Sequence, residues 1–185
     1  MLAVLIIAVL TTVIALLRGG SLESLAATKV KWLWLVWVGL IAQVGFRILE
    51  PPWLTDTWGL IVLASTNLVI VWFMVLNRQQ PGMILVAVGL LMNLVVITAN
   101  EAMPVSDYVF EVIDIDESAL DSAGFKHERM TGETVLPWLG DVVPIPPLRE
   151  VWSIGDFVLA AGIGYFVWAR TLAERKRGRH RTRRA

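Results

Sequence analysis

The feature that decides the fold is residues 154–185, IGDFVLAAGIGYFVWARTLAERKRGRHRTRRA, in which an apolar segment runs directly into an arginine-rich tail. The tail, residues 170–185, holds eight Lys or Arg and one acidic residue. The stretch before the apolar segment, residues 99–152, has the opposite balance, with eleven Asp or Glu against three basic residues. Basic residues next to membrane spans stay on the cytoplasmic side. The pattern therefore predicts an integral membrane protein with an acidic outer loop and an inner C-terminus.

Five apolar segments predict helices that cross the roughly 30 Å hydrocarbon core of a bilayer. They are residues 2–17, 32–49, 58–76, 83–99 and 154–168. Basic residues lie in the first and third connections and in the tail, whereas acidic residues lie in the second and fourth. All connections agree on a topology with the N-terminus outside and the C-terminus inside. We predict an all-α fold: a polytopic membrane bundle over residues 1–169, with a structured outer loop at 99–153, and a basic cytoplasmic tail at 170–185.

The composition excludes several kinds of site. The chain is 56% hydrophobic, has no cysteine, and has two histidines, His127 and His180. Disulfides, thiolate chemistry and histidine-rich metal sites are therefore excluded, and no carboxylate spacing indicates a metal site. We expect no metal and no cofactor. The tail is expected to fix the topology and attract anionic lipid among the membrane lipids; without interleaved aromatic residues it does not predict nucleic-acid binding.

Polar side chains inside the apolar segments are the first candidates for a functional pocket. They are Gln43, Arg47, Asn67, Asn93 and Asn100. Arg47 either reaches out to the lipid headgroups or pairs with an outer-loop carboxylate such as Asp141 or Asp156. The amides either join helices by hydrogen bonds or line a polar pocket.

The outer loop supplies the second group of candidates, His127, Trp138 and Asp141. Residues 116–124 predict a short helix that ends at Gly124. Residues 136–147, LPWLGDVVPIPP, are too apolar for a solvated linker, so we predict that they pack on the outer mouth of the bundle.

Residues 153–156, Ser-Ile-Gly-Asp, fit a capping box at the start of the last span, with Ser153 at the N-cap and Asp156 at N3. Asp156 has a catalytic alternative, in which it pairs with Asp141. Two carboxylates held close together cannot both ionise easily, and such a pair supplies an acid and a base for activating water.

Over most of its length the chain resembles an uncharacterised family of bacterial integral membrane proteins, a domain of unknown function. The residues that carry this resemblance are Gly19-Gly20, Asn93, Ala99-Asn100 through Met103-Pro104, Lys126-His127, Trp138-Leu139-Gly140-Asp141 and Ser153-Ile154-Gly155-Asp156. The resemblance implies the bacterial cytoplasmic (inner) membrane, with several passes. It implies no activity.

The chain is also distantly similar to lipoprotein signal peptidases, which are aspartic enzymes with four spans. Residues 92–95, Met-Asn-Leu-Val, resemble the third-span motif of that family, and Asp141 and Asp156 resemble carboxylates around its fourth span. Val96, however, stands where that family has its first catalytic aspartate, and the family's signature after its first span is missing. The similarity therefore implies shared architecture more than peptidase activity.

Three functions follow from these residues. The first is a non-catalytic membrane module whose outer loop binds a partner protein, lipid or envelope component. The second is an aspartic membrane hydrolase that uses Asp141 and Asp156. The third is a small transporter or lipid-handling protein with a pocket at Arg47, Asn67 and Asn93. We predict the first, because the hydrolase pattern is incomplete and no inverted repeat indicates a transporter.

Overall fold

The computed structural model describes residues 2–49, 56–113 and 127–173, without the side chains of Gln43, Phe46, Arg47, Leu49 and Asp56. This part of the chain is mostly helical. Its α-helices are α1 (Leu2–Leu17), α2 (Leu22–Ala26), α3 (Trp34–Leu49), α4 (Asp56–Leu76), α5 (Met83–Asn100), α6 (Asp107–Ile113) and α8 (Ile154–Thr171). The five long helices coincide with the five apolar segments to within three residues at each end. The short helices α2 and α6 were not predicted, because neither is long enough to show a clear periodicity.

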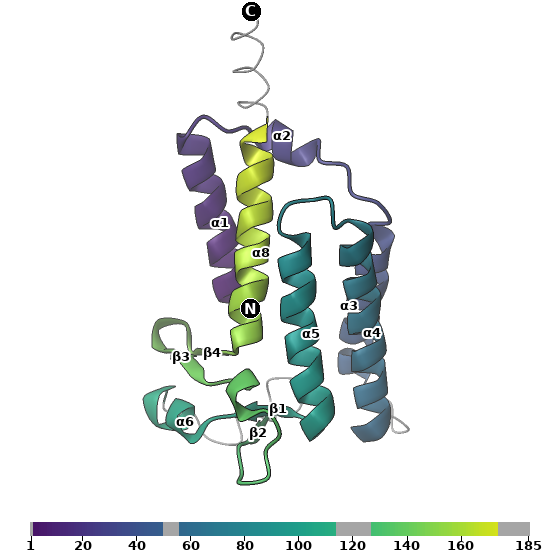
Figure 1. Cartoon of the computed structure of the whole chain (residues 1–185), viewed down its shortest axis with the longest axis vertical. Helices are drawn as coiled ribbons and strands as arrows, with labels where there is room; N and C mark the ends of the chain where they lie inside the picture. Colours follow the sequence, from purple (N-terminus) through teal and green to yellow (C-terminus); the bar gives the residue numbers. More distant parts are fainter. Residues whose placement is uncertain (1, 50–55, 114–126, 174–185) are drawn as a thin grey trace, which may run out of the picture.

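The long helices stand side by side in the order α1, α8, α5, α4, α3 (Figure 1). Extensive helix–helix contact joins neighbours in this order, so the helices of the predicted bundle are arranged in a row. A row leaves much apolar surface uncovered: Leu5 is 59% exposed, Ile41 66% and Trp72 59%. Two described helices, Thr57–Leu76 and Met83–Asn100, are long and apolar enough to cross a membrane, and α1 is a shorter apolar helix.

The closest contact in the row is between α5 and α8, which meet through glycines. A Cβ added to Gly89 would lie 2.5 Å from the carbonyl oxygen of Gly155. Two turns along, a Cβ on Gly82 would meet the carbonyl oxygen of Gly162 at 2.0 Å. A spacing of seven residues places each glycine pair on one face of its helix. On α8, Gly162 faces α5, whereas Gly164 faces Ile7 and Thr11 of α1.

The same contacts set α8 at a different height from α5. Because Gly82 faces Gly162, α8 continues for nine more residues, to Thr171, above the start of α5. At about 1.5 Å per residue this is a step of about 13 Å. Helix α1 is shifted in the same direction as α8, because Ser21 N, just beyond the end of α1, donates to the Thr171 carbonyl at 2.8 Å. In Figure 1, α1 and α8 stand higher than α3, α4 and α5.

The segment between α5 and α8 folds as a small unit, which we call the cap, defined here as residues 101–113 and 127–153. It contains four three-residue strands and two short 3-10 turns in addition to α6. They are β1 (Met103–Val105), β2 (His127–Arg129), β3 (Val143–Ile145), β4 (Glu150–Trp152), η1 (Pro137–Leu139) and η2 (Pro146–Leu148). β1 pairs with β2 in parallel, Met103 opposite His127, and β3 pairs with β4 antiparallel, Val143 opposite Trp152. The all-α prediction holds for most of the described chain but misses these strands, because three residues are too few to show alternation in sequence.

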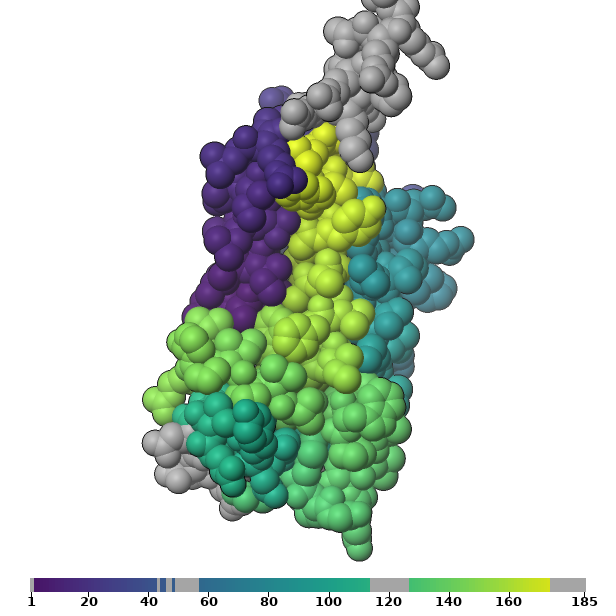
Figure 2. All heavy atoms as spheres, turned by 60° about the vertical axis from the view of Figure 1, so that its left-hand side comes forward, coloured from purple at the N-terminus to yellow at the C-terminus, as the bar shows by residue number. Residues whose placement is uncertain are grey.

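The cap packs on one end of the helices, directly below α1 and α8 (Figure 2). Leu139 is buried against Val96 and Met103, while Val143 and Ile145 pack on a cluster that includes Trp152. The predicted packing of residues 136–147 against the helix ends is therefore confirmed, while the prediction that this is the outer end stays a prediction. The helix predicted at 116–124 lies outside the described residues.

Candidate functional site

The first site candidate is a polar cluster where the cap joins α5 and α8, formed by Asn93, His127, Asp141, Ser153 and Asp156. We call it the junction cluster. It begins with the predicted capping box, which the structure confirms. Asp156 N donates to Ser153 Oγ at 3.0 Å, and Ser153 N donates to Asp156 Oδ2 at 3.0 Å. The box fixes the Asp156 carboxylate at the first turn of α8, where the helix dipole favours a negative charge.

Asn93 reaches this carboxylate from α5, because Gly155 has no side chain to block it. A Cβ on Gly155 would lie 1.9 Å from Asn93 Oδ1. Asn93 Nδ2 donates to Asp156 Oδ1 at 2.8 Å. The Ser153 hydroxyl lies 2.9 Å from Asn93 Oδ1 and 3.0 Å from Asp156 Oδ2. The amide of Asn93 therefore joins two helices, the structural alternative given for it from sequence.

Asp141 enters the cluster from the cap, where strand-like bonds hold its backbone beside β1. Asp141 N donates to the Pro104 carbonyl at 2.8 Å, and Ser106 N donates to the Asp141 carbonyl at 3.0 Å. The preceding Gly140 is needed for this approach, since a Cβ there would lie 2.5 Å from the Pro104 oxygen. These contacts direct the Asp141 side chain inward, where the residue is only 5% exposed.

The Asp141 carboxyl has an unusual environment. Its Oδ2 lies 3.5 Å from His127 Nε2. Its Oδ1 is buried without a hydrogen-bond partner among the described residues. Burial raises the pKa of Asp141 well above its ordinary value, and the negative charge of Asp156 raises it further. A protonated carboxylic acid is the form that such a site favours.

The structure thus brings together four predicted site residues, Asn93, His127, Asp141 and Asp156. Their arrangement suits a joint better than a catalytic centre. Both oxygens of Asp156 accept hydrogen bonds that hold the helix start together, and Asp141 is buried. A carboxylate that is to activate water has to meet both water and substrate. The bonds among Asn93, Ser153 and Asp156 instead join α5 to the start of α8.

The other predicted pocket residues do not assemble around it. Asn67 Nδ2 donates to the Leu63 carbonyl of its own helix at 2.9 Å. Asn100 holds the cap: its amide bonds to both the carbonyl and the N–H of Val135, at 2.9 and 2.8 Å. Trp138 is 57% exposed on η1. The side chains of Gln43 and Arg47 lie outside the described ones, so pairing of Arg47 with Asp141 or Asp156 stays a prediction.

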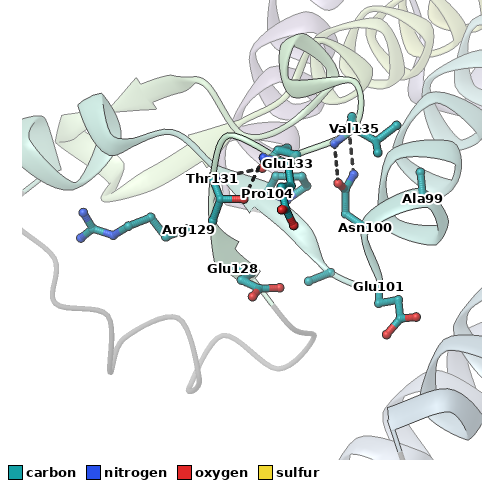
Figure 3. A pocket seen from close by; sticks show the side chains of 11 residues that line it. Ala99, Asn100, Glu101, Pro104, Glu128, Arg129, Thr131, Glu133 and Val135 are labelled. Carbon is teal, nitrogen blue, oxygen red and sulfur yellow. Dashed lines mark hydrogen bonds between the residues drawn. The ribbon is translucent and has the colours of Figure 1, made fainter.

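The second site candidate is a pocket on the cap that the sequence analysis missed. It has a volume of about 300 Å³ and lies beside Asn100, with Glu101, Glu128 and Glu133 among its lining residues (Figure 3). We call it the acidic pocket. Glu101 ends α5 in a left-handed conformation, with φ of 59°. Glu128 lies in β2, and Glu133 lies in a turn closed by Thr134 Oγ1, which accepts from Thr131 N at 2.8 Å.

The charges of the acidic pocket are not neutralised within the described part of the chain. No ion pair joins Glu101, Glu128 or Glu133 to a described residue. Arg129 also lines the pocket, but its guanidinium pairs with Asp107 at 2.9 Å and lies 4.4 Å from the centre of the Phe110 ring. Among the described residues no group of three acidic or histidine side chains could hold a metal ion. The spread of charge suits an extended cationic ligand better than a bare ion. In sequence, the only signal was the acidic excess of the whole loop.

The sequence profile of a family of unknown function, DUF5317, matches residues 27–168. No curated protein and no solved structure matches the chain. The matched range begins before α3 and ends within α8, so it contains both the junction cluster and the acidic pocket. The likeness to lipoprotein signal peptidases gains no support from these comparisons.

Proposed function

The chain belongs to a family of unknown function (DUF5317), and we propose that it is a non-catalytic membrane protein whose outer cap binds a basic segment of a partner protein. The proposed location is the bacterial inner membrane, crossed five times by α1, α3, α4, α5 and α8. The N-terminus lies outside and the tail inside, where it attracts anionic lipid.

Exposed apolar surface supports the membrane part of this proposal. Helices α4 and α5 are long and apolar enough to span a membrane, yet most of their residues are not buried within the protein. A soluble protein would bury such helices, because exposed apolar area costs about 25 cal/mol per Å² in water. Lipid tails in contact with the apolar side chains remove this cost, so both faces of a single row of helices can stay uncovered by protein.

The observation that carries the binding proposal is the acidic pocket, a concavity with three glutamates that no described cation neutralises. Like charges held together without counter-charges attract a ligand of the opposite sign. Lys or Arg side chains of a partner would supply that charge. The bonds between Asn100 and Val135 and the packing of Leu139 on Val96 hold the cap on the end of α5, beside the pocket.

The binding test uses the full chain in nanodiscs of phosphatidylcholine, with a fluorescent decalysine peptide as the probe. Anisotropy titrations compare wild type with Glu128→Gln and with Glu111→Gln. Glu111 lies on α6, also on the cap, but does not line the acidic pocket. We expect Glu128→Gln to weaken binding about two- to fivefold, as the loss of a charge pair worth up to about 1 kcal/mol implies. Glu111→Gln should bind like wild type. Equal effects of the two substitutions, or no peptide binding at low salt, would refute the proposal.

The raised pKa of Asp141 beside Asp156 is the observation that favours the second candidate, an aspartic membrane hydrolase. Its test is whether Asp141→Asn and Asp156→Asn each leave a folded protein that has lost hydrolysis of peptide bonds in a membrane-embedded substrate. Hydrolysis by the wild type at a rate equal to that of both variants would reject it.

A further inference from the structure

A second recess lies at the other end of the helices, beside the α4–α5 turn. It has a volume of about 420 Å³ and is formed by the turn, the first residues of α5, and Tyr165 of α8. We call it the inner recess. It is a consequence of the step between helices: the turn ends level with Gly162, while α8 continues to Thr171. The recess therefore lies beside the projecting part of α8.

One side of the inner recess is polar and basic. Arg78 is exposed, and no acidic partner for it is found in the described part of the chain. Gln80 donates through Nε2 to the Lys29 carbonyl at 2.9 Å, which leaves its Oε1 buried without a hydrogen-bond partner among the same residues. Lys31 N donates to Asn77 Oδ1 at 2.7 Å, and Asn77 Nδ2 donates to the Lys31 carbonyl at 2.9 Å. The segment that carries two further lysines is thus tied to the turn.

Three other residues that line the inner recess are apolar or aromatic. Ile84 is 47% exposed, Leu85 42% and Tyr165 54%. A ligand that contacts both groups of residues needs a negative charge for Arg78 and an apolar part for Ile84 and Leu85. A free inorganic anion would use only the first of these.

We propose that the inner recess binds an anionic phospholipid such as phosphatidylglycerol. The lipid phosphate pairs with Arg78, and an acyl chain lies along Ile84 and Leu85. The site rests on the proposed insertion in a membrane but is independent of the acidic pocket, which lies at the opposite end of the molecule.

The test is native mass spectrometry of the full chain in detergent, titrated with phosphatidylglycerol or phosphatidylcholine. Wild type should retain phosphatidylglycerol in preference. Arg78→Gln should retain about fivefold less, the factor that corresponds to about 1 kcal/mol per basic residue at an anionic membrane. Arg78→Lys should restore most of the retention. Arg149→Gln, which removes one positive charge from the cap, is the matched control and should behave like wild type.

Two competitors identify the source of the phosphate. Inorganic phosphate and glycerophosphoglycerol, the same headgroup without chains, should not displace the lipid at millimolar concentration. Displacement by either would overturn the proposal, because the apolar wall would then contribute nothing. Equal retention by wild type and Arg78→Gln, or equal retention of the two lipids, would overturn it as well.

Two further measurements separate this proposal from the proposed function. Flotation with liposomes tests membrane insertion, on which both depend. Decalysine binding to Arg78→Gln tests the acidic pocket alone, and it should equal that of wild type. If Arg78→Gln loses lipid retention but still binds the peptide like wild type, the effect is confined to the inner recess.

Discussion

Replacing Gly155 by alanine should separate α5 from α8 and loosen the cap. The new Cβ would lie 1.9 Å from Asn93 Oδ1 and 2.9 Å from the Gly89 carbonyl oxygen. Inserting one methyl group into a packed contact costs about 1–3 kcal/mol. If Asn93 moves away, its bond to Asp156 is also lost, at about 1.5–3 kcal/mol for a bond to a charged group. The expected loss of stability is therefore about 2.5–6 kcal/mol, the sum of the two terms.

Gly45→Ala is the matched control, because a Cβ on that residue of α3 meets nothing within 4 Å. In a helix interior, alanine is favoured over glycine by about 0.5–1 kcal/mol. The same substitution should therefore stabilise one helix and destabilise the other. The assay is reversible unfolding of the purified protein in mixed micelles, followed by circular dichroism.

The clash with Asn93 gives a third variant. If that amide is the obstacle, Asn93→Ala combined with Gly155→Ala should cost less than the two single changes added together. Strict additivity would show that the Asn93 amide is not what the new methyl group meets. Gly155→Ala as stable as Gly45→Ala would refute the whole account of the α5–α8 contact.

The remaining predictions concern charge and topology. The folded pKa of Asp141 is raised, so its ionisation destabilises the fold: stability is highest below the unfolded pKa and falls as pH rises towards the folded value. Asp141→Asn should remove this decline, measured as unfolding free energy between pH 4 and 8, and an unchanged pH profile would contradict it. Asp156→Asn should instead cost about 1 kcal/mol as a weakened cap; wild-type stability would contradict this. A reporter enzyme fused after Ala185 should be active only inside the cell, and activity outside would reject the proposed topology.

The parts of the fold that sequence could predict are those encoded locally. The five long helices follow from uninterrupted apolar length, and the Ser153–Asp156 box follows from four consecutive residues. Asp141 could be named as a candidate, but not placed, because its burial depends on β1, a strand thirty-six residues earlier in the chain.

The acidic pocket could not be predicted for a similar reason. Glu101, Glu128 and Glu133 come together only because β1 pairs with β2, and strands of three residues leave no pattern in the sequence. The arrangement of the helices in a row could not be predicted from the sequence either. Every long helix is apolar on most of its surface, so periodicity does not indicate which face meets a neighbour.

The step between α8 and α5 has a consequence for the surrounding bilayer. Each of these eighteen-residue helices is about 27 Å long, and their offset of about 13 Å leaves only about 14 Å of shared height. A flat bilayer of uniform thickness cannot match both at once, and each ångström of mismatch carries a cost of a fraction of a kcal/mol. In the proposed membrane topology, lipid tails around α1 and α8 would therefore sit closer to the cytoplasm than those around α3 and α4. The protein would then tilt the midplane of the membrane across its own width.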